Sequence, residues 1–253
     1  MDLGLKGKRA IVTGGTRGIG RRIAELLIAE GCHVGFCARD TAEVERTITE
    51  LGTDGPRVLG GVVDVANDEQ LRQWISDTAD GLGGLDIVVP NASALVGGAD
   101  VEAWRKGLEV DILGTVRTVE AAMPYLEASD AAAIVAISST AAINTAGGVR
   151  AYSGMKAALI SYMSGLSTNL GAKGIRANTV SPGAIYFEGG VWDVRKREAP
   201  DAYAAAVARC PIGRLGTPEE VANAVVFLAS PAAGYISGTN LIVDGAATSR
   251  IQY

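Results

Sequence analysis

A tyrosine and a lysine stand four residues apart in the stretch AYSGMKAAL, residues 151–159. If this stretch is helical, Tyr152 and Lys156 share one face, and the ammonium group lies near the phenol. A phenol is a poor acid–base catalyst at neutral pH unless a nearby cation and a hydrogen bond stabilise its ionised form. The spacing therefore predicts a proton-transfer site at Tyr152, with packing inside a helix as the alternative.

A serine lies thirteen residues before Tyr152, in the stretch AISSTAA. The preceding residues 133–138 have the composition of a buried strand, which places Ser139 at its carboxyl end. Ligands of open α/β sheets bind at that end, where a hydroxyl group can polarise a substrate oxygen. Ser138 should point away, because adjacent strand residues face opposite sides.

Near the N-terminus, the stretch IVTGGTRGIGRRI carries four glycines between a predicted strand and a predicted helix. Glycine lets the backbone adopt positive φ and lets a pyrophosphate approach the N–H groups of a helix N-terminus. The spacing Gly14-x-x-x-Gly18-x-Gly20 differs from the Gly-x-Gly-x-x-Gly dinucleotide pattern. We expect a pyrophosphate-binding turn, with a plain tight connection as the alternative.

Two arginines favour NADP(H) over NAD(H) as the dinucleotide. Ala38 stands where an NAD enzyme has a carboxylate, at the end of the second predicted strand, and Arg39 follows it. An arginine forms bidentate, charge-assisted hydrogen bonds with a 2′-phosphate. Arg17, in the glycine turn, can face the same phosphate, although both arginines can also be solvated surface residues.

Asp64, after the third predicted strand, can accept from the adenine amino group or cap a helix.

These residues need a scaffold that brings several strand ends together. Apolar or β-branched runs alternate with segments of helical periodicity, and several runs are continuously apolar, as in strands that helices cover on both faces. We predict an α/β fold: a doubly wound, mainly parallel seven-stranded sheet of Rossmann type flanked by helices, in a single domain over residues 1–253. The predicted strands span residues 9–13, 33–37, 58–63, 86–89, 133–138, 176–181 and 240–244.

Two helix starts carry local signals that agree with this fold. Asp40 with Glu43, and Thr217 with Glu220, have the spacing of reciprocal N-terminal capping boxes. Pro218 follows Thr217 at the first helical position, where proline is favoured. We expect helices to begin at both places.

The least regular part of the chain runs over residues 184–214. Long insertions in compact folds are often lids or binding loops, so we expect a substrate-binding loop region there. Its aromatic residues Tyr186, Phe187 and Trp192 are expected to form a wall facing the substrate, with a small core of the loop itself as the alternative.

Composition and charge exclude several classes of protein. The net charge of −5, with dispersed basic residues, argues against nucleic-acid binding. Three cysteines without a Cys-x-x-Cys pair and one histidine, His33, are too few for a metal site, and His33 lacks the partners of a catalytic triad. The sequence contains no signal-peptide pattern and no apolar run long enough to span a bilayer. We expect a cytoplasmic protein with free, buried thiols.

Together the motifs resemble the short-chain dehydrogenase/reductase family in order and spacing, across essentially the whole chain. They are the glycine turn, PNASA at 90–94, Ser139, Tyr152-x-x-x-Lys156, SPG at 181–183 and GTNLIVDGA at 238–246. By this resemblance Tyr152 is the general acid–base, Lys156 assists it and binds the nicotinamide ribose, and Ser139 orients the substrate oxygen. The resemblance also implies that the cofactor is bound by Gly14, Thr16, Arg17, Gly18, Ile19, Gly20, Arg39, Asp64, Val65, Asn91, Ala92, Tyr152, Lys156, Pro182, Gly183 and Ile185.

Three residues depart from the family pattern. Ser93 stands where the family usually has glycine, and Phe187 replaces a common threonine near the nicotinamide carboxamide. Asp111 occupies the position of the asparagine that usually completes a catalytic tetrad. Asp111 can substitute for that asparagine in the proton relay, or it can bind Lys156 too tightly.

The expected function is an NADP(H)-dependent oxidoreductase that passes a hydride between nicotinamide and a small-molecule secondary alcohol or ketone. The alternatives are a 3-oxoacyl-thioester reductase, acting on an acyl carrier protein or coenzyme A substrate, and a noncatalytic NADP-binding protein whose departures mark decay. Wide apolar stripes on residues 109–126 and on the helix of Tyr152 suit burial against another subunit, with packing inside the domain as the alternative. With the resemblance, they predict a homotetramer, or a homodimer, with no nucleic-acid or membrane partner.

Overall fold

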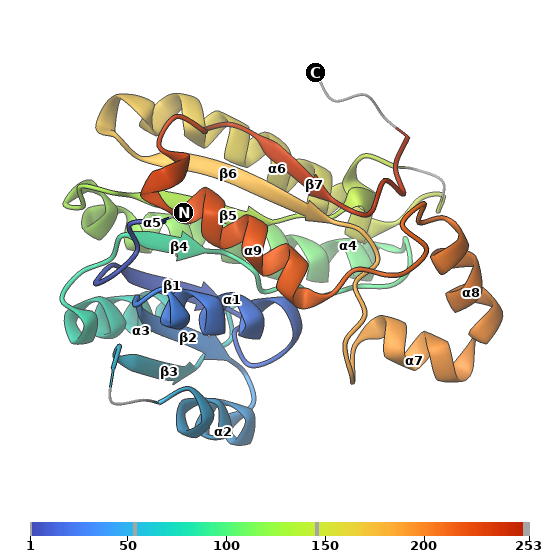
Figure 1. Ribbon diagram of the computed structural model, residues 1–253, viewed down its shortest axis with the longest axis horizontal. Helices are drawn as coiled ribbons and strands as arrows, with labels where there is room; N and C mark the ends of the chain where they lie inside the picture. The colour runs from blue at the N-terminus through green and yellow to red at the C-terminus, as the bar shows by residue number, and fades with distance from the viewer. Residues whose placement is uncertain (1, 53–54, 145–146, 250–253) are drawn as a thin grey trace.

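A computed structural model describes residues 2–52, 55–144 and 147–249, and within them seven parallel strands form one sheet in the order β3-β2-β1-β4-β5-β6-β7 (Figure 1). The order reverses between β1 and β4, which is the doubly wound arrangement that the sequence predicts. Each predicted strand is confirmed to within one residue at either end. The strands are β1 (Arg9–Thr13), β2 (His33–Ala38), β3 (Val58–Val62), β4 (Ile87–Val89), β5 (Ala133–Ile137), β6 (Arg176–Pro182) and β7 (Asn240–Val243).

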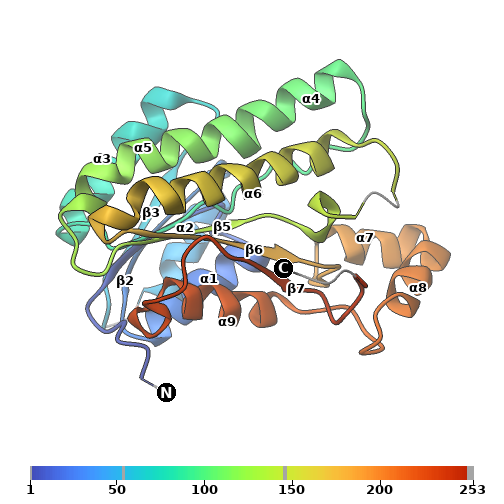
Figure 2. The ribbon, with the colours of Figure 1, turned by 90° about the horizontal axis from the view of Figure 1, so that it is seen from above.

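Helices cover both faces of this sheet. In Figure 2, α3, α5 and α6 lie on one side of the strands, and α1 and α9 lie on the other. Among the residues that the structure describes, no helix is both long and apolar enough to cross a bilayer. The α-helices are α1 (Gly18–Ala29), α2 (Thr41–Leu51), α3 (Asp68–Leu82), α4 (Val101–Gly107), α5 (Gly114–Glu127), α6 (Ala151–Leu170), α7 (Val191–Glu198), α8 (Pro200–Ala208) and α9 (Pro218–Ala229), and a π-helical segment (Leu108–Leu113) joins α4 to α5.

The central strands are apolar because side chains on both of their faces are covered. β4 and β5 are buried over their whole length, and β1 is buried after its first residue. Each fully buried aliphatic side chain, such as Leu27 on one face or Ile134 on the other, contributes about 1.5–3 kcal/mol. The two apolar layers therefore hold the strand ends, and the loops that follow them, at fixed positions.

The two predicted capping boxes have different outcomes. At α9 the box is complete: the Glu220 carboxylate accepts from the Thr217 N–H (2.9 Å), and the Thr217 hydroxyl accepts from the Glu220 N–H. The Arg214 guanidinium lowers the pKa of Glu220 to about 2, so this carboxylate is ionised at neutral pH. At α2, Asp40 does cap the helix by accepting from the Glu43 N–H (2.8 Å).

The predicted reciprocal hydrogen bond at α2, from the Asp40 N–H to the Glu43 carboxylate, is wrong. The Glu43 carboxylate instead accepts a hydrogen bond from the Thr16 hydroxyl (2.9 Å), in the glycine turn between β1 and α1. A tertiary partner has therefore replaced the local one. The contact ties the start of α2 to the turn that follows β1.

Residues 184–214 are more regular than the sequence predicts. They contain α7 and α8, which lie beyond the carboxyl ends of the strands (Figure 1). Pro200 occupies the first turn of α8 and an alanine-rich run follows it, so both the start and the body of this helix have favourable residues. The expected irregular loop is a small helical lobe.

Replacing Thr217 with alanine should lower the free energy of unfolding by about 1 kcal/mol, because α9 loses the hydroxyl that caps its N-terminus. Urea unfolding of the variant measures this loss. Thr49→Ala is the matched control, since Thr49 is also exposed but lies inside α2, where alanine is the better helix former. Equal destabilisation by the two substitutions would contradict a capping role.

Candidate active site

The glycine turn joins β1 to α1 at the carboxyl edge of the sheet. Gly14 and Gly18 have φ of +68° and +55°, in the left-handed region where other residues are strained. Arg17 is the N-cap residue of α1, and within the described structure its side chain forms no cap hydrogen bond. The first N–H groups of α1 thus keep their capacity to bind an anion such as a phosphate.

Close packing behind the turn requires glycine at position 20. A Cβ atom on Gly20 would lie 2.2 Å from the Gly14 carbonyl oxygen and 2.4 Å from the Asn91 side-chain nitrogen. The Asn91 amide donates to the carbonyl oxygens of Thr13 (2.9 Å) and Gly14 (3.0 Å). The Thr13 hydroxyl accepts from the backbone N–H groups of Asn91 and Ala92. Asn91 and Thr13 together therefore stabilise the turn. The role of Thr13 could not be predicted from the sequence, because its partner Asn91 lies 78 residues away.

Two further residues of the turn face the protein. The Thr16 hydroxyl donates to Glu43, as described above, and Ile19 packs against the apolar core beneath α1. Arg17 is exposed. Of these three side chains, the arginine is the one directed at solvent.

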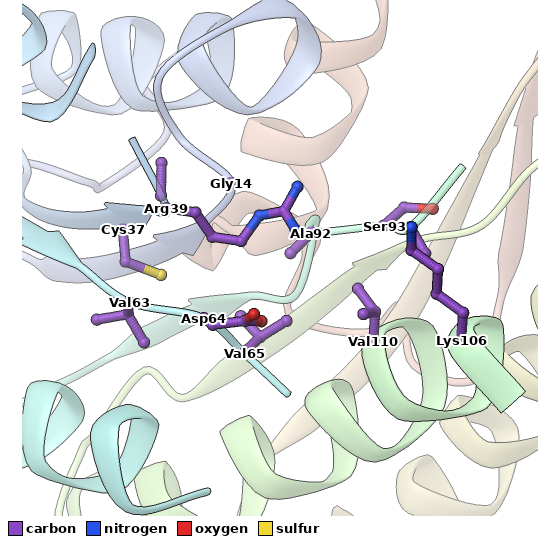
Figure 3. Close-up of a pocket in the computed structure, with 12 residues that line it drawn as sticks. Gly14, Cys37, Arg39, Val63, Asp64, Val65, Ala92, Ser93, Lys106 and Val110 are labelled. Carbon is purple, nitrogen blue, oxygen red and sulfur yellow. The ribbon is translucent and has the colours of Figure 1, made fainter. Parts of the chain in front are cut away.

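A cavity of about 140 Å³ lies beside the turn, where the strand order reverses. Arg39 extends along this cavity from the end of β2 (Figure 3). Lys106 and Val110 also line it, and no local sequence pattern marks them, because they reach the cavity from a helical stretch distant in the chain. The lining residues that the sequence analysis assigned to the cofactor are Gly14, Arg39, Asp64, Val65 and Ala92.

Asp64 lines the cavity but does not cap a helix. Its carboxylate accepts from the Ala66 N–H (3.0 Å), and the N-cap residue of α3 is Asn67. The helix-capping alternative for Asp64 is therefore wrong. Val65, the next residue, is buried against Gly114, where a Cβ atom would lie 3.1 Å from the Val65 side chain.

The three residues expected near the nicotinamide lie at the end of β6 and just after it. Pro182 ends that strand, and Gly183 donates its N–H to the Val243 carbonyl oxygen (2.9 Å). A Cβ atom on Gly183 would lie 2.7 Å from the Asp244 side chain, so this position needs glycine. Ile185 is buried. The segment is thereby held against the C-terminal strand.

Tyr152 and Lys156 share one face of α6, as the spacing predicts. Tyr152 lies in the first turn and is half-buried, whereas the Lys156 side chain is only 3% exposed. The Lys156 ammonium nitrogen lies 5.8 Å from the centroid of the Tyr152 ring. The cation is therefore held out of water and close to the phenol, where its charge acts most strongly.

The Lys156 ammonium group has two partners besides the tyrosine ring. It donates to the Ile137 carbonyl oxygen (3.0 Å) and pairs with the Asp111 carboxylate (3.0 Å). The Asp111 side chain is 1% exposed, so this is a buried ion pair. Such a pair is stable only where further hydrogen bonds satisfy both ions.

Glycines let the two halves of this ion pair approach each other. A Cβ atom on Gly107 would lie 2.8 Å from Met155, and one on Gly154 would lie 2.4 Å from the Trp104 ring. The stretch from α4 through the π-helical segment can therefore pack tightly against α6. This packing brings Asp111 to Lys156 across 45 residues of sequence.

Ser139 follows β5, two residues after the carbonyl group that holds Lys156. The Ser139 hydroxyl oxygen accepts from the Ala141 N–H (3.1 Å), which leaves its proton to be donated to a ligand. Ser138 is buried and donates to the Lys156 carbonyl oxygen (2.8 Å). The two hydroxyl groups therefore have different partners, and that they face different sides of the sheet stays a prediction.

The expected aromatic wall does not form as one unit. Tyr186 and Trp192 pack against the small core of the helical lobe, whose buried residues are Ala206, Cys210 and Leu215. Phe187 instead lies over the glycine turn, where a Cβ atom on Gly18 would be 2.6 Å from its ring. The alternative reading, a core belonging to the lobe itself, is the correct one for Tyr186 and Trp192.

The cysteines and the histidine have packing roles. Cys37 lines the cavity, but burial raises the pKa of its thiol to about 12, so the thiol is protonated at neutral pH. Burial likewise raises the pKa of Cys32 to about 12. His33 accepts a hydrogen bond from the Arg57 N–H through Nδ1 (2.8 Å). Among the described residues, no group of three or more histidine, cysteine or acidic side chains is placed to hold a metal ion.

Comparison with known sequences gives matches over nearly the whole chain. A family model described as enoyl-(acyl carrier protein) reductase matches residues 14–248. Isoepoxydon dehydrogenase patN of Penicillium expansum is 38% identical over 251 residues, which cover 97% of this chain and 96% of that protein. The 3-oxoacyl-[acyl-carrier-protein] reductase FabG of Escherichia coli (strain K12) is 34% identical over 247 residues, covering 96% and 98%.

Comparison with solved structures agrees. The crystal structure of L-sorbose reductase from Gluconobacter frateurii, complexed with NADPH and L-sorbose, matches with a TM-score of 0.90 and 30% sequence identity. The match covers 99% of this chain and 100% of that one. The fold and the chain length of the two proteins therefore correspond throughout.

Gly20→Ala should lower the free energy of unfolding by about 1–3 kcal/mol, because its Cβ atom must displace the backbone of the turn. Gly171→Ala is the matched control: Gly171 is exposed, has a helical φ of −56°, and has open space around its Cβ position. That control should leave stability unchanged or raise it by up to about 1 kcal/mol. Urea unfolding of both variants checks this, and a neutral Gly20→Ala would contradict the packing argument.

Proposed function

The chain belongs to the short-chain dehydrogenase/reductase family, and on that premise we propose that it passes a hydride between NADP(H) and a secondary alcohol or ketone. The observation that carries this function is a juxtaposition at one sheet edge. Tyr152, Lys156 and Ser139 lie at the carboxyl edge of the same parallel sheet, which also presents the glycine turn and the cavity. A proton-transfer group and a dinucleotide site are thus combined.

The fold presents a cradle that fits a dinucleotide. Gly14 and Gly18 have the positive φ that shapes the turn, and the N-terminus of α1 offers N–H groups to a pyrophosphate. The bound nicotinamide supplies or accepts the hydride. We assign contact with the cofactor to the predicted residues Gly14, Thr16, Arg17, Gly18, Ile19, Gly20, Arg39, Asp64, Val65, Asn91, Ala92, Tyr152, Lys156, Pro182, Gly183 and Ile185.

Four side chains have separate roles in the proposed proton transfer. Tyr152 gives a proton to the substrate oxygen in reduction and takes it back in oxidation. Lys156 stabilises the ionised phenol through its charge. Ser139 donates a hydrogen bond to the substrate oxygen, and Asp111 balances the charge of the buried ammonium group.

The charges around the cavity support NADP(H) over NAD(H). Arg39 lies along the cavity, and Ala38 before it has no carboxylate to repel a 2′-phosphate. The exposed Arg17 stands on the adjoining turn. L-sorbose reductase, the structural relative described above, binds NADPH.

We assign substrate selection to the region 184–214, whose helical lobe stands beside the sheet edge that carries Tyr152. Exposed Trp104 and Leu108, next to α6, support assembly into a homotetramer or a homodimer. The three free, buried thiols support a reducing, cytoplasmic location.

A second candidate activity is reduction of a 3-oxoacyl thioester. It is supported by the 34% identity to the FabG protein, whose name specifies such a substrate. The basic residues of α7 do not favour it, because each is engaged within the lobe. Arg195 stacks on Trp192, Lys196 lies over Tyr186, and Arg197 pairs with Asp193.

Tyr152→Phe should lower kcat by about 10³-fold, because general acid–base catalysis contributes 10²–10⁴-fold. The assay uses a panel of small ketones and 3-oxoacyl thioesters, and the better substrate class separates the two candidate activities. Binding of NADPH, followed by fluorescence, should change less than about threefold. Tyr162→Phe is the matched control on the same helix, since burial raises the pKa of Tyr162 to about 12. Retention of turnover by Tyr152→Phe would remove Tyr152 from the mechanism.

Arg39→Ala should weaken NADPH binding by about 10–100-fold, because a charge-assisted hydrogen bond to the 2′-phosphate is lost. NADH binding should change less than about twofold. Arg46→Ala, at an exposed arginine of α2, is the control and should alter neither affinity. The dissociation constants come from fluorescence titrations, and equal losses for both dinucleotides, or a preference of the native chain for NADH, would contradict the role of Arg39.

A further inference from the structure

Ser93 and Asp111, two of the residues that depart from the family pattern, contact each other. The Ser93 hydroxyl donates to Asp111 Oδ1 at 2.5 Å. The Ala94 N–H donates to the other oxygen of the same carboxylate, Oδ2, at 3.0 Å. The segment after β4 is thus attached to the carboxylate that pairs with Lys156.

The hydrogen bonds around Asp111 show what the serine contributes. Its carboxylate is 1% exposed and has lost water as a partner. Oδ1 accepts from both Lys156 and Ser93, and Oδ2 accepts from Ala94. A buried carboxylate with its acceptors filled in this way is held in place, whereas one with an empty acceptor site is costly.

The carboxylate in turn limits the orientation of the ammonium group. Lys156 has three N–H donors, of which one bonds to Ile137 and one to Asp111. With two of the bonds around a tetrahedral nitrogen fixed, the direction of the third is fixed as well. That remaining donor is the one that can serve the phenol of Tyr152 or the ribose of a bound cofactor.

Ser93 also holds the backbone that borders the cavity. Its hydroxyl oxygen accepts from the Leu95 N–H (3.2 Å), and Leu95 has a φ of +47°, which is strained for a residue other than glycine. Ser93 itself lines the cavity, near Lys106 (Figure 3). One hydroxyl group therefore links the cavity wall to the buried ion pair.

We propose that Ser93 is a positioning residue that acts through Asp111 to hold the Lys156 ammonium group in its working direction. This inference rests on the oxidoreductase function proposed above. Ser93 does not exchange a proton with the substrate in this role. Its effect passes through the carboxylate, so that Ser93 and Asp111 behave as one unit.

The chain contains a matched control at the opposite edge of the sheet. The Ser129 hydroxyl donates to the buried carboxylate of Asp86 (2.6 Å), which pairs with Arg9 (2.7 Å). Burial tends to raise the pKa of Asp86, but hydrogen bonds from Arg9 and Ser129 outweigh it and lower the pKa. This serine, carboxylate and cation have the same chemistry without proximity to Tyr152.

The test compares Ser93→Ala, Asp111→Asn and the double variant in the full chain, with kcat, KM and NADPH affinity as readouts. We expect Ser93→Ala to lower kcat about tenfold while KM and the NADPH dissociation constant change less than threefold. Ser93→Thr, which keeps a hydroxyl group, should retain at least half of the native kcat. Ser129→Ala should lower the unfolding midpoint as Ser93→Ala does, yet leave kcat within twofold of native.

The double variant decides whether the two residues form one unit. Its kcat should lie within about twofold of that of Asp111→Asn alone. In Asp111→Asn the carboxylate through which Ser93 acts is already gone, so loss of the Ser93 hydroxyl should add little. Multiplication of the two single effects, or an equal loss of kcat in Ser129→Ala, would overturn the proposal.

A separate readout covers failure of the proposed function or poor folding of Ser93→Ala. If the native chain reduces no member of the substrate panel, the oxidoreductase function is overturned, and the unfolding midpoints of the same variants then test the coupling of Ser93 to Asp111. Additive midpoint shifts would overturn that coupling.

If Ser93→Ala does not fold, Ser93→Thr and Ser93→Gly are compared, and equal kcat in these two would exclude a role for the hydroxyl.

Discussion

Every strand of the sheet runs in the same direction, and the positions of all the chemical groups depend on this constraint. Because the strands are parallel, their carboxyl ends meet at one edge, and the residues that follow β1, β4, β5 and β6 become neighbours. The strand order reverses between β1 and β4, and the cavity lies at that point. The glycine turn, the Ser93 segment and Ser139 follow β1, β4 and β5, which all end at this edge of the sheet.

Charge at this edge is balanced inside the protein. Lys156 and Asp111 are both removed from water, and each is satisfied by groups from other elements: Ile137 for the ammonium group, and Ser93 and Ala94 for the carboxylate. An ion pair so enclosed does not gain much stability from its own attraction. Its value lies in the fixed direction it imposes on a cation beside Tyr152.

The helical lobe of residues 184–214 has its own small core, and one of its aromatic rings reaches the glycine turn. Phe187 lies over Gly18, where a side chain on the glycine would collide with it. Tyr186 and Trp192 remain within the lobe. The region assigned to substrate selection is therefore in direct contact with the turn assigned to the pyrophosphate.

The sequence by itself determined the strand positions, the glycine turn, the cap at Thr217 and the shared helix face of Tyr152 and Lys156. These features depend on residues within a few positions of one another, so periodicity and spacing reveal them. Only the tertiary structure decided that Asn91 braces the turn, that Glu43 bonds to Thr16, and that Ser93, Asp111 and Lys156 form one network. These contacts join residues that lie 18 to 78 positions apart in the chain. They arise from the packing of whole helices and strands, which no local pattern encodes.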